Sequence, residues 1–146
     1  MPKINIITEV NNDYETVFEC FNLELFGKLT PPFIPFKILK FDGCKVGDEV
    51  HIELDFILFK QLWISKITEN FKDTEEIFFI DEGIKLPFFL KKWKHKHIIQ
   101  KSAKGSKIID DINFQTPFFI PDIAFYPVMY FMFFYRKKIY SSFFNI

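Results

Sequence analysis

The residues best suited to chemistry in this sequence lie in one short segment that carries two histidines. Trp93, His95 and His97 are separated by single residues, and side chains two positions apart on a β-strand point to the same face of the sheet. The lysines between them are costly to bury, so the face with the imidazoles is expected to point inward. The sequence therefore predicts two histidines side by side in the interior.

The following segment supplies a carboxylate to the same face. With a loop at 102–105, the two segments form a hairpin that sets apolar residues against apolar residues and an imidazole against a carboxylate. The predicted pairs are Ile99 with Ile108, His97 with Asp110, His95 with Ile112, and Trp93 with Phe114. A register shifted by one residue would set His97 against Asp111 instead, and would turn Asn113 inward.

The pairing of His97 with Asp110 has three interpretations. The two groups satisfy each other's hydrogen bonds inside the sheet, or the carboxylate orients the histidine for proton transfer or ligand binding, or the histidines bind a metal. Zn²⁺ usually takes three protein groups, and a third ligand is not obvious. Asp81 could come near, but nothing in the sequence places it there. No metal and no cofactor are therefore predicted.

Nucleophiles are not placed beside a base in this sequence. Cys20 and Cys44 lie on other segments than the histidines, and Ser65 has no visible partner. A hydrolase or transferase of the usual kind would need such a combination. The two cysteines have no metal-binding spacing, so free thiols in a cytoplasmic protein are expected.

The composition excludes some classes of protein. The 146 residues suffice for one domain, 1–146, with its own core. The 22 Phe imply a thick core or a lined cavity. The formal charge is zero, and the only arginine is Arg136. Because nucleic-acid recognition favours clustered positive charge and arginine forks, no nucleic-acid partner is predicted.

A membrane span is not predicted either. The apolar segment from Ile123 to Tyr135 has about 13 residues before Arg136, short of the roughly 20 that a span needs. Pro127 interrupts it further. The first residues, MPKINIITEV, lack the apolar stretch and cleavage site of a signal peptide.

The order of elements indicates an α+β fold. Alternating apolar residues, turn signals and prolines mark each segment. Asp81, Glu82 and Gly83 are expected to form a turn. Strands are predicted at 3–10, 36–41, 49–59, 62–71, 75–80, 92–101 and 107–116, two short helices at 14–21 and 22–29, and a long helix at 123–144.

The long C-terminal helix is apolar on all sides, and a helix can bury only one stripe against its own sheet. The residues predicted to face the sheet and a cavity are Phe125, Val128, Met132, Tyr135, Ile139 and Phe143. The remaining aromatic residues, which cover loops or meet a second copy in a homodimer, are Tyr126, Tyr130, Phe133 and Phe134.

Several short motifs, in order, resemble the helix-grip fold of the START / birch-pollen-allergen superfamily, also called SRPBCC. The matching motifs are Leu29-Thr30-Pro31-Pro32, Phe41-Asp42-Gly43-Cys44, Gly47-Asp48, Trp63 with Ile67, Phe79-x-Asp81, Trp93-x-His95-x-His97, Asp110-x-Ile112-x-Phe114-x-x-Pro117 and Tyr135-Arg136. One segment departs from the pattern: Leu86-Pro87-Phe88 stands where the superfamily usually has Gly-Pro and an aromatic residue, and the run to Trp93 is longer.

This resemblance implies a curved antiparallel sheet of six or seven strands around a long C-terminal helix, and a binder of hydrophobic small molecules or lipids. It does not imply one reaction, because the superfamily mixes carriers, cyclases and other proteins. The alternative is a cyclase, dehydratase or hydrolase with His95, His97 and Asp110 in proton-transfer roles. The residues expected to contact the ligand are Trp63, Asp81, Trp93, His95, His97, Asp110, Ile112, Phe114, Val128, Met132 and Tyr135.

Overall fold

The computed structural model describes residues 2–31 and 34–144. Pro32, the last residue of the Leu-Thr-Pro-Pro motif, lies outside the described residues. Within them the strands are β1 (Lys3–Val10), β2 (Phe36–Phe41), β3 (Glu49–Asp55), β4 (Lys60–Lys72), β5 (Glu76–Lys85), β6 (Lys92–Ser102) and β7 (Gly105–Gln115), and the helices are α1 (Tyr14–Glu19), α2 (Leu23–Lys28) and α3 (Asp122–Phe144).

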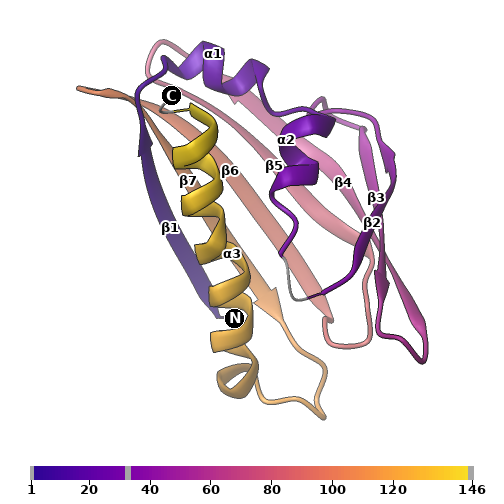
Figure 1. Ribbon diagram of the computed structural model, residues 1–146. Helices are drawn as coiled ribbons and strands as arrows, with labels where there is room; N and C mark the ends of the chain where they lie inside the picture. Colours follow the sequence, from indigo (N-terminus) through magenta and orange to yellow (C-terminus); the bar gives the residue numbers. More distant parts are fainter. Residues whose placement is uncertain (1, 32–33, 145–146) are drawn as a thin grey trace.

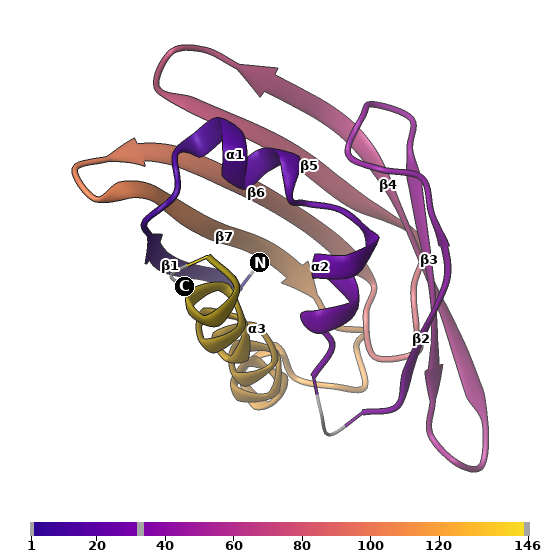
Figure 2. The ribbon, with the colours of Figure 1, turned by 45° about the horizontal axis from the view of Figure 1, so that its top comes forward.

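The strands of the described ranges form one antiparallel sheet of seven strands in the order β1-β7-β6-β5-β4-β3-β2. The sheet curves around α3, which lies along its concave side (Figure 1). Figure 2 shows the molecule turned so that its top comes forward. In this view α1 and α2 lie on the same side of the sheet as α3, and α2 lies closer to β2 and β3. The predicted helix-grip fold, with two short helices after the first strand, is confirmed.

Local sequence accounts for the first three elements. In β1 every second residue is buried, as a half-buried strand requires. Asp13 then accepts a hydrogen bond from the backbone N–H of Thr16 at 2.9 Å, and Asn22 accepts one from the N–H of Leu25 at 3.1 Å. These two N-caps begin α1 and α2 and satisfy amide groups that the first turn leaves unpaired.

The β6–β7 hairpin has the predicted register, with Trp93 opposite Phe114 and His97 opposite Asp110. The strands continue to Ser102 and Gly105, so the turn is tighter than the loop expected from the sequence. Gly105 has φ +148°, and a Cβ there would lie 2.5 Å from the backbone oxygen of Asn11. A side chain at this position would push the hairpin away from the end of β1.

The turn predicted at Asp81, Glu82 and Gly83 is wrong. These residues continue β5, where Asp81 pairs with Ile67 of β4 and with His95 of β6. The carboxylates and glycine of this segment resemble a turn signal, but hydrogen bonds to strands on both sides hold it extended. Asp81 therefore lies in the middle of the sheet.

The stripe of α3 that packs inward also differs from the prediction. Its buried residues are Met129, Met132, Phe133, Tyr140 and Phe144. Phe133 was expected to be left over and is buried, whereas Val128 was expected to face inward and is 45% exposed. Because the helix carries apolar residues on every side, its periodicity does not identify the buried stripe.

None of the helices in the described part of the chain combines the length and the apolar character that a membrane crossing needs.

Candidate functional site

A pocket of about 110 Å³ lies between the concave face of the sheet, α2 and α3. Its wall is mostly apolar and rich in aromatic rings. The polar or ionisable side chains that line it are Asn22, Thr30, Cys44, Ser65, Asp81, His95, His97 and Arg136. A pocket of this kind, with apolar walls and a few polar groups that converge, is typical of small-molecule sites.

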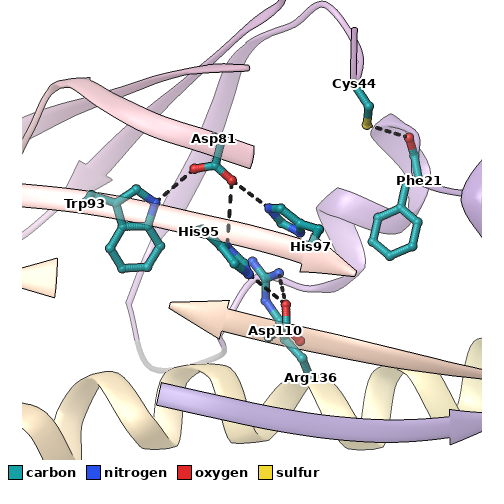
Figure 3. Close-up of polar contacts among 8 residues, drawn as sticks. All are labelled: Phe21, Cys44, Asp81, Trp93, His95, His97, Asp110 and Arg136. Atoms are coloured by element: carbon teal, nitrogen blue, oxygen red, sulfur yellow. Dashed lines mark hydrogen bonds and ion pairs between the residues drawn. The ribbon is translucent and has the colours of Figure 1, made fainter. Parts of the chain in front are cut away.

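Asp81 is the centre of the polar group (Figure 3). Its Oδ1 accepts a hydrogen bond from Trp93 Nε1 at 2.9 Å, and its Oδ2 lies 2.6 Å from His97 Nε2. The same Oδ2 is 3.7 Å from His95 Nδ1. One carboxylate from β5 therefore contacts all three residues of the Trp-His-His motif on β6.

Asp110 occupies the other side of His95. Its Oδ1 lies 2.8 Å from His95 Nε2 and 3.6 Å from Arg136 Nη1 of α3. The guanidinium of Arg136 also stacks over the ring of Phe133, 4.5 Å from its centre. The polar group is thus connected from β5 through β6 and β7 to the helix.

The predicted contact between His97 and Asp110 is wrong at the level of side chains. The two residues are backbone neighbours as expected, but His97 bonds to Asp81, and Asp110 bonds to His95. Both contacts run diagonally across neighbouring strands, which long side chains can reach. The sequence prediction named Asp81 but could not place it beside the histidines, because its segment has the composition of a turn.

Ring stacking holds the two imidazoles in place. His97 stacks on Phe79 with centroids 4.2 Å apart and planes at 10°. His95 stacks on His97 with centroids 3.6 Å apart. Trp93 and Phe133 meet His95 by ring edges. Packing on several sides leaves these rings little freedom to turn.

Burial and the neighbouring charges set the protonation of this group. Burial and the nearby His95 together lower the pKa of His97 to about 4, against the opposing effect of Asp81. Burial alone would raise the pKa of Asp81, but contacts with His97, His95 and Trp93 outweigh it and hold that pKa below its usual range. At neutral pH the site therefore combines an ionised carboxylate with a neutral imidazole that donates Nε2–H to it.

Asp110 is ionised for a similar reason. Burial opposes its charge, but the hydrogen bond from His95 and the guanidinium of Arg136 lower its pKa below the usual range. An ionised carboxylate at this depth requires such partners.

Two buried nitrogen atoms of pocket residues have no hydrogen-bond partner among the described residues. They are Nε1 of Trp63 and Nδ1 of His97. Buried polar atoms are paired in most structures, so these two nitrogens are exceptions among the residues of the pocket wall.

Cys44 contributes a thiol to the pocket, but not a nucleophile. Its Sγ lies 3.5 Å from the backbone oxygen of Phe21, and burial raises its pKa to about 12. Within the described ranges Cys44 and Cys20 are both free cysteines.

Six of the residues expected to contact a ligand line the pocket: Trp63, Asp81, Trp93, His95, His97 and Met132. The other five do not. Ile112 and Phe114 are buried in the core, Asp110 supports His95 from behind, and Val128 and Tyr135 lie elsewhere on α3.

The sequence prediction missed most of the wall opposite the sheet. Phe21 and Phe26 from the α1–α2 region, Cys44 beside β3, and Phe133 and Arg136 from α3 all line the pocket. Arg136 carried one signal, since it is the only arginine in the sequence and follows Tyr135 in a matching motif. The three phenylalanines carried none, because the chain has 22.

Comparison with known proteins agrees with this fold. The structure resembles a solution structure of a protein from Arthrobacter aurescens, with TM-score 0.65, 13% identity and coverage of 95% of this chain and 82% of that one. It also resembles Ara h 8.0201, with TM-score 0.55, 18% identity and coverage of 88% and 87%.

A third similar structure is the Zhui aromatase/cyclase from Streptomyces sp. R1128, with TM-score 0.56, 14% identity and coverage of 84% of this chain and 72% of that one. No protein-family model matches the sequence, and no curated protein matches it. The resemblance to the START / birch-pollen-allergen superfamily that the motifs suggested is thus confirmed at the level of the fold.

Proposed function

We propose that this protein binds a small, largely apolar molecule in the pocket between the sheet, α2 and α3, and that a polar end of the molecule faces Asp81, His97 and Trp63. The observation that carries the proposal is the pocket itself, whose wall is mostly apolar and in which a few polar side chains, Asp81 and His97 among them, converge. The apolar wall supplies affinity by burial. The polar atoms supply orientation.

The volume of the pocket limits the size of the ligand. A volume of about 110 Å³ is near that of an engineered cavity of about 150 Å³ that binds benzene. Pockets for drug-sized ligands measure roughly 300 to 1,000 Å³. The volume therefore favours a molecule with one ring over a whole lipid, although both belong to the hydrophobic ligands expected from the sequence.

The test uses the fluorescence of Trp63 and Trp93, the only two tryptophans of the chain, since both line the pocket. Phenol, benzene and oleate are titrated separately into the protein in the presence of a chelator. We expect saturable quenching by phenol, with benzene about ten times weaker because one hydrogen bond is missing. Oleate should bind more weakly than phenol at equal concentration.

A matched pair of variants locates the binding. Ser65→Phe places a ring in the pocket, whereas Val46→Phe places the same ring on an exposed position. Ser65→Phe should abolish phenol binding, and Val46→Phe should leave it unchanged. Equal binding by both variants, or no saturable signal in the unmodified protein, would refute the proposal.

A second candidate is an enzyme that moves protons on such a ligand. The observation in its favour is that His95 and His97 both line the pocket, and each is bonded to a carboxylate that can orient it. One protein of similar fold is an aromatase/cyclase, which is an argument by analogy. Exchange of ligand C–H protons in D₂O, lost in His97→Gln and kept in His51→Gln, would support this candidate. Binding without exchange would exclude it for the ligand tested.

A further inference from the structure

We propose that Asp81, His95 and His97 form a binding site for one divalent first-row transition-metal ion. One ligand atom from each residue lies within 4.8 Å of the other two. The third ligand that the sequence did not reveal is thus supplied by β5. This proposal goes beyond ligand binding in the pocket and does not depend on which organic molecule enters it.

The geometry is close to that of an occupied site. Asp81 Oδ2 lies 2.6 Å from His97 Nε2 and 3.7 Å from His95 Nδ1. Ligand atoms around a tetrahedral ion with bonds of about 2.0–2.2 Å are roughly 3.3–3.6 Å apart. Side-chain shifts of about 1 Å would therefore bring the three atoms into one coordination sphere. Two imidazoles and one carboxylate are a donor set that suits zinc and non-haem iron.

Two neighbouring residues, Asp110 and Trp93, already bond to the other nitrogen of His95 and the other oxygen of Asp81. Asp110 bonds to Nε2 of His95 and so leaves Nδ1 toward Asp81. Trp93 bonds to Oδ1 of Asp81, and Oδ2 contacts the two histidines with which it would share the ion, so the ion would replace the hydrogen bond from His97. A carboxylate behind a ligating histidine is the usual second layer of a metal site, because it orients the ring and makes it a better donor.

His97 can become a ligand without a change in its number of protons. Its Nε2 would bind the ion once the ring proton moves to Nδ1. Among the described residues Nδ1 of His97 has no hydrogen-bond partner, so no neighbouring donor fixes the ring in the other tautomer.

Charge and access also fit a cation. The carboxylates of Asp81 and Asp110 face the two imidazoles, and Arg136 balances one of them from the side of α3. A divalent ion would balance the negative charge of the second carboxylate. All three ligating residues line the pocket, so a further coordination position would open onto it, as in sites where an ion contacts a bound molecule.

The experiment is a metal titration of the untagged, chelator-treated protein. Co²⁺ is followed by its visible ligand-field absorption, and Zn²⁺ by calorimetry. We expect one equivalent of each to bind. Asp81→Asn and His97→Gln should weaken binding at least a hundredfold. Asp110→Asn, which removes a positioning residue, should weaken it by about 10- to 100-fold.

The matched control is His51→Gln. His51 lies 2.8 Å from Glu49 and so forms a histidine–carboxylate pair with no third ligand close by among the described residues. This variant should bind both metals as the unmodified protein does. Each variant is checked by circular dichroism before titration.

A second measurement needs no variant. Histidine ring signals of the unmodified protein are followed by ¹⁵N NMR as Zn²⁺ is added, and we expect the signals of His95 and His97 to shift while that of His51 stays. If the Asp81→Asn variant fails to fold, the NMR titration of the unmodified protein tests the metal site by itself.

The proposal is overturned if neither metal binds at tenfold excess, if His51 is the ring that shifts, or if binding survives in both ligand variants. Phenol binding is measured in chelator and metal binding without phenol, so either proposal can fail without the other.

Discussion

Two histidines of this protein lie against carboxylates at nearly equal distances, yet their surroundings differ. His97 Nε2 is 2.6 Å from Asp81, on the concave face of the sheet. His51 Nε2 is 2.8 Å from Glu49 on β3. His51 lies between Val50 and Ile52, which line the pocket. Because neighbouring side chains of a strand alternate in direction, His51 points to the other face of the sheet.

The difference shows that the distance between a histidine and a carboxylate does not by itself decide how much the contact contributes to stability. The side chains of His51 and Glu49 are 24% and 32% exposed, so solvent screens their interaction. The side chains of His97 and Asp81 are 11% and 13% exposed, and those of His95 and Asp110 beside them are 2% and 1% exposed, so a group left there without a partner remains unsatisfied. The inner group is therefore connected through several strands, whereas the outer pair stands alone.

The largest effect is expected from Asp110→Ala. This change leaves Arg136 and His95 without their buried carboxylate, and breaking such a contact costs about 3–5 kcal/mol. Urea unfolding at pH 7 measures the loss. Asp111→Ala, the neighbouring aspartate on the opposite face of β7, should cost much less. Equal losses would show that the inner contacts add no stability of their own.

The next effect is a pH dependence. The pKa of His97 is lowered to about 4 in the folded protein, so the unfolded chain binds a proton more readily than the folded one below about pH 6.5. Stability is then fully present above pH 6.5 and is lost as the pH falls toward 4, by about 3 kcal/mol.

Urea unfolding of the metal-free protein at several pH values measures this slope. Protonation of Asp81 and Asp110, whose pKa values lie below the usual range, adds to the loss at lower pH. His97→Gln should flatten the curve between pH 6.5 and 4.5, and His51→Gln should not. A curve unchanged in His97→Gln would contradict the assignment.

A smaller effect separates the two tryptophans. Trp93→Phe keeps a ring but removes the hydrogen bond to the ionised Asp81, which should cost roughly 1.5–3 kcal/mol beyond the loss of ring area. Trp63→Phe removes an indole whose Nε1 is unpaired among the described residues. The free energy of unfolding should therefore fall more for Trp93→Phe. The opposite order would mean that the contact with Asp81 contributes little.

The smallest effect is expected at the outer pair. His51→Gln and Glu49→Gln should leave the melting temperature unchanged within error, because exposed ion pairs contribute little to stability. Differential scanning calorimetry measures the shift. A loss comparable to that of Asp110→Ala would remove the distinction between the two regions.

The β6–β7 hairpin was the most predictable part of the site. The alternation of Trp93, His95 and His97 with lysines indicated the inward face, and the match of apolar residues across the turn indicated the register. Both are local properties: a strand has a period of two, and a short loop leaves few registers in which buried residues meet. The order of elements was equally readable, so the helix-grip fold could be predicted.

Three features were decided by the tertiary structure alone. Asp81 reaches the histidines because β4 and β6 hold β5 extended through a segment with the composition of a turn. The inward stripe of α3, with Phe133 and without Val128, follows from packing, since a helix that is apolar all round has no periodic signal. Phe21 and Phe26 close the pocket because α1 and α2 fold over the sheet.

The sequence by itself thus determined which strand carries the imidazoles and which way they face, because that information lies in neighbouring residues. The partners of those imidazoles come from β5 and β7, residues 81 and 110, and Arg136 of α3 contacts the second of them. Their meeting depends on the register of several strands and on the rotation of one helix, which only the folded chain sets.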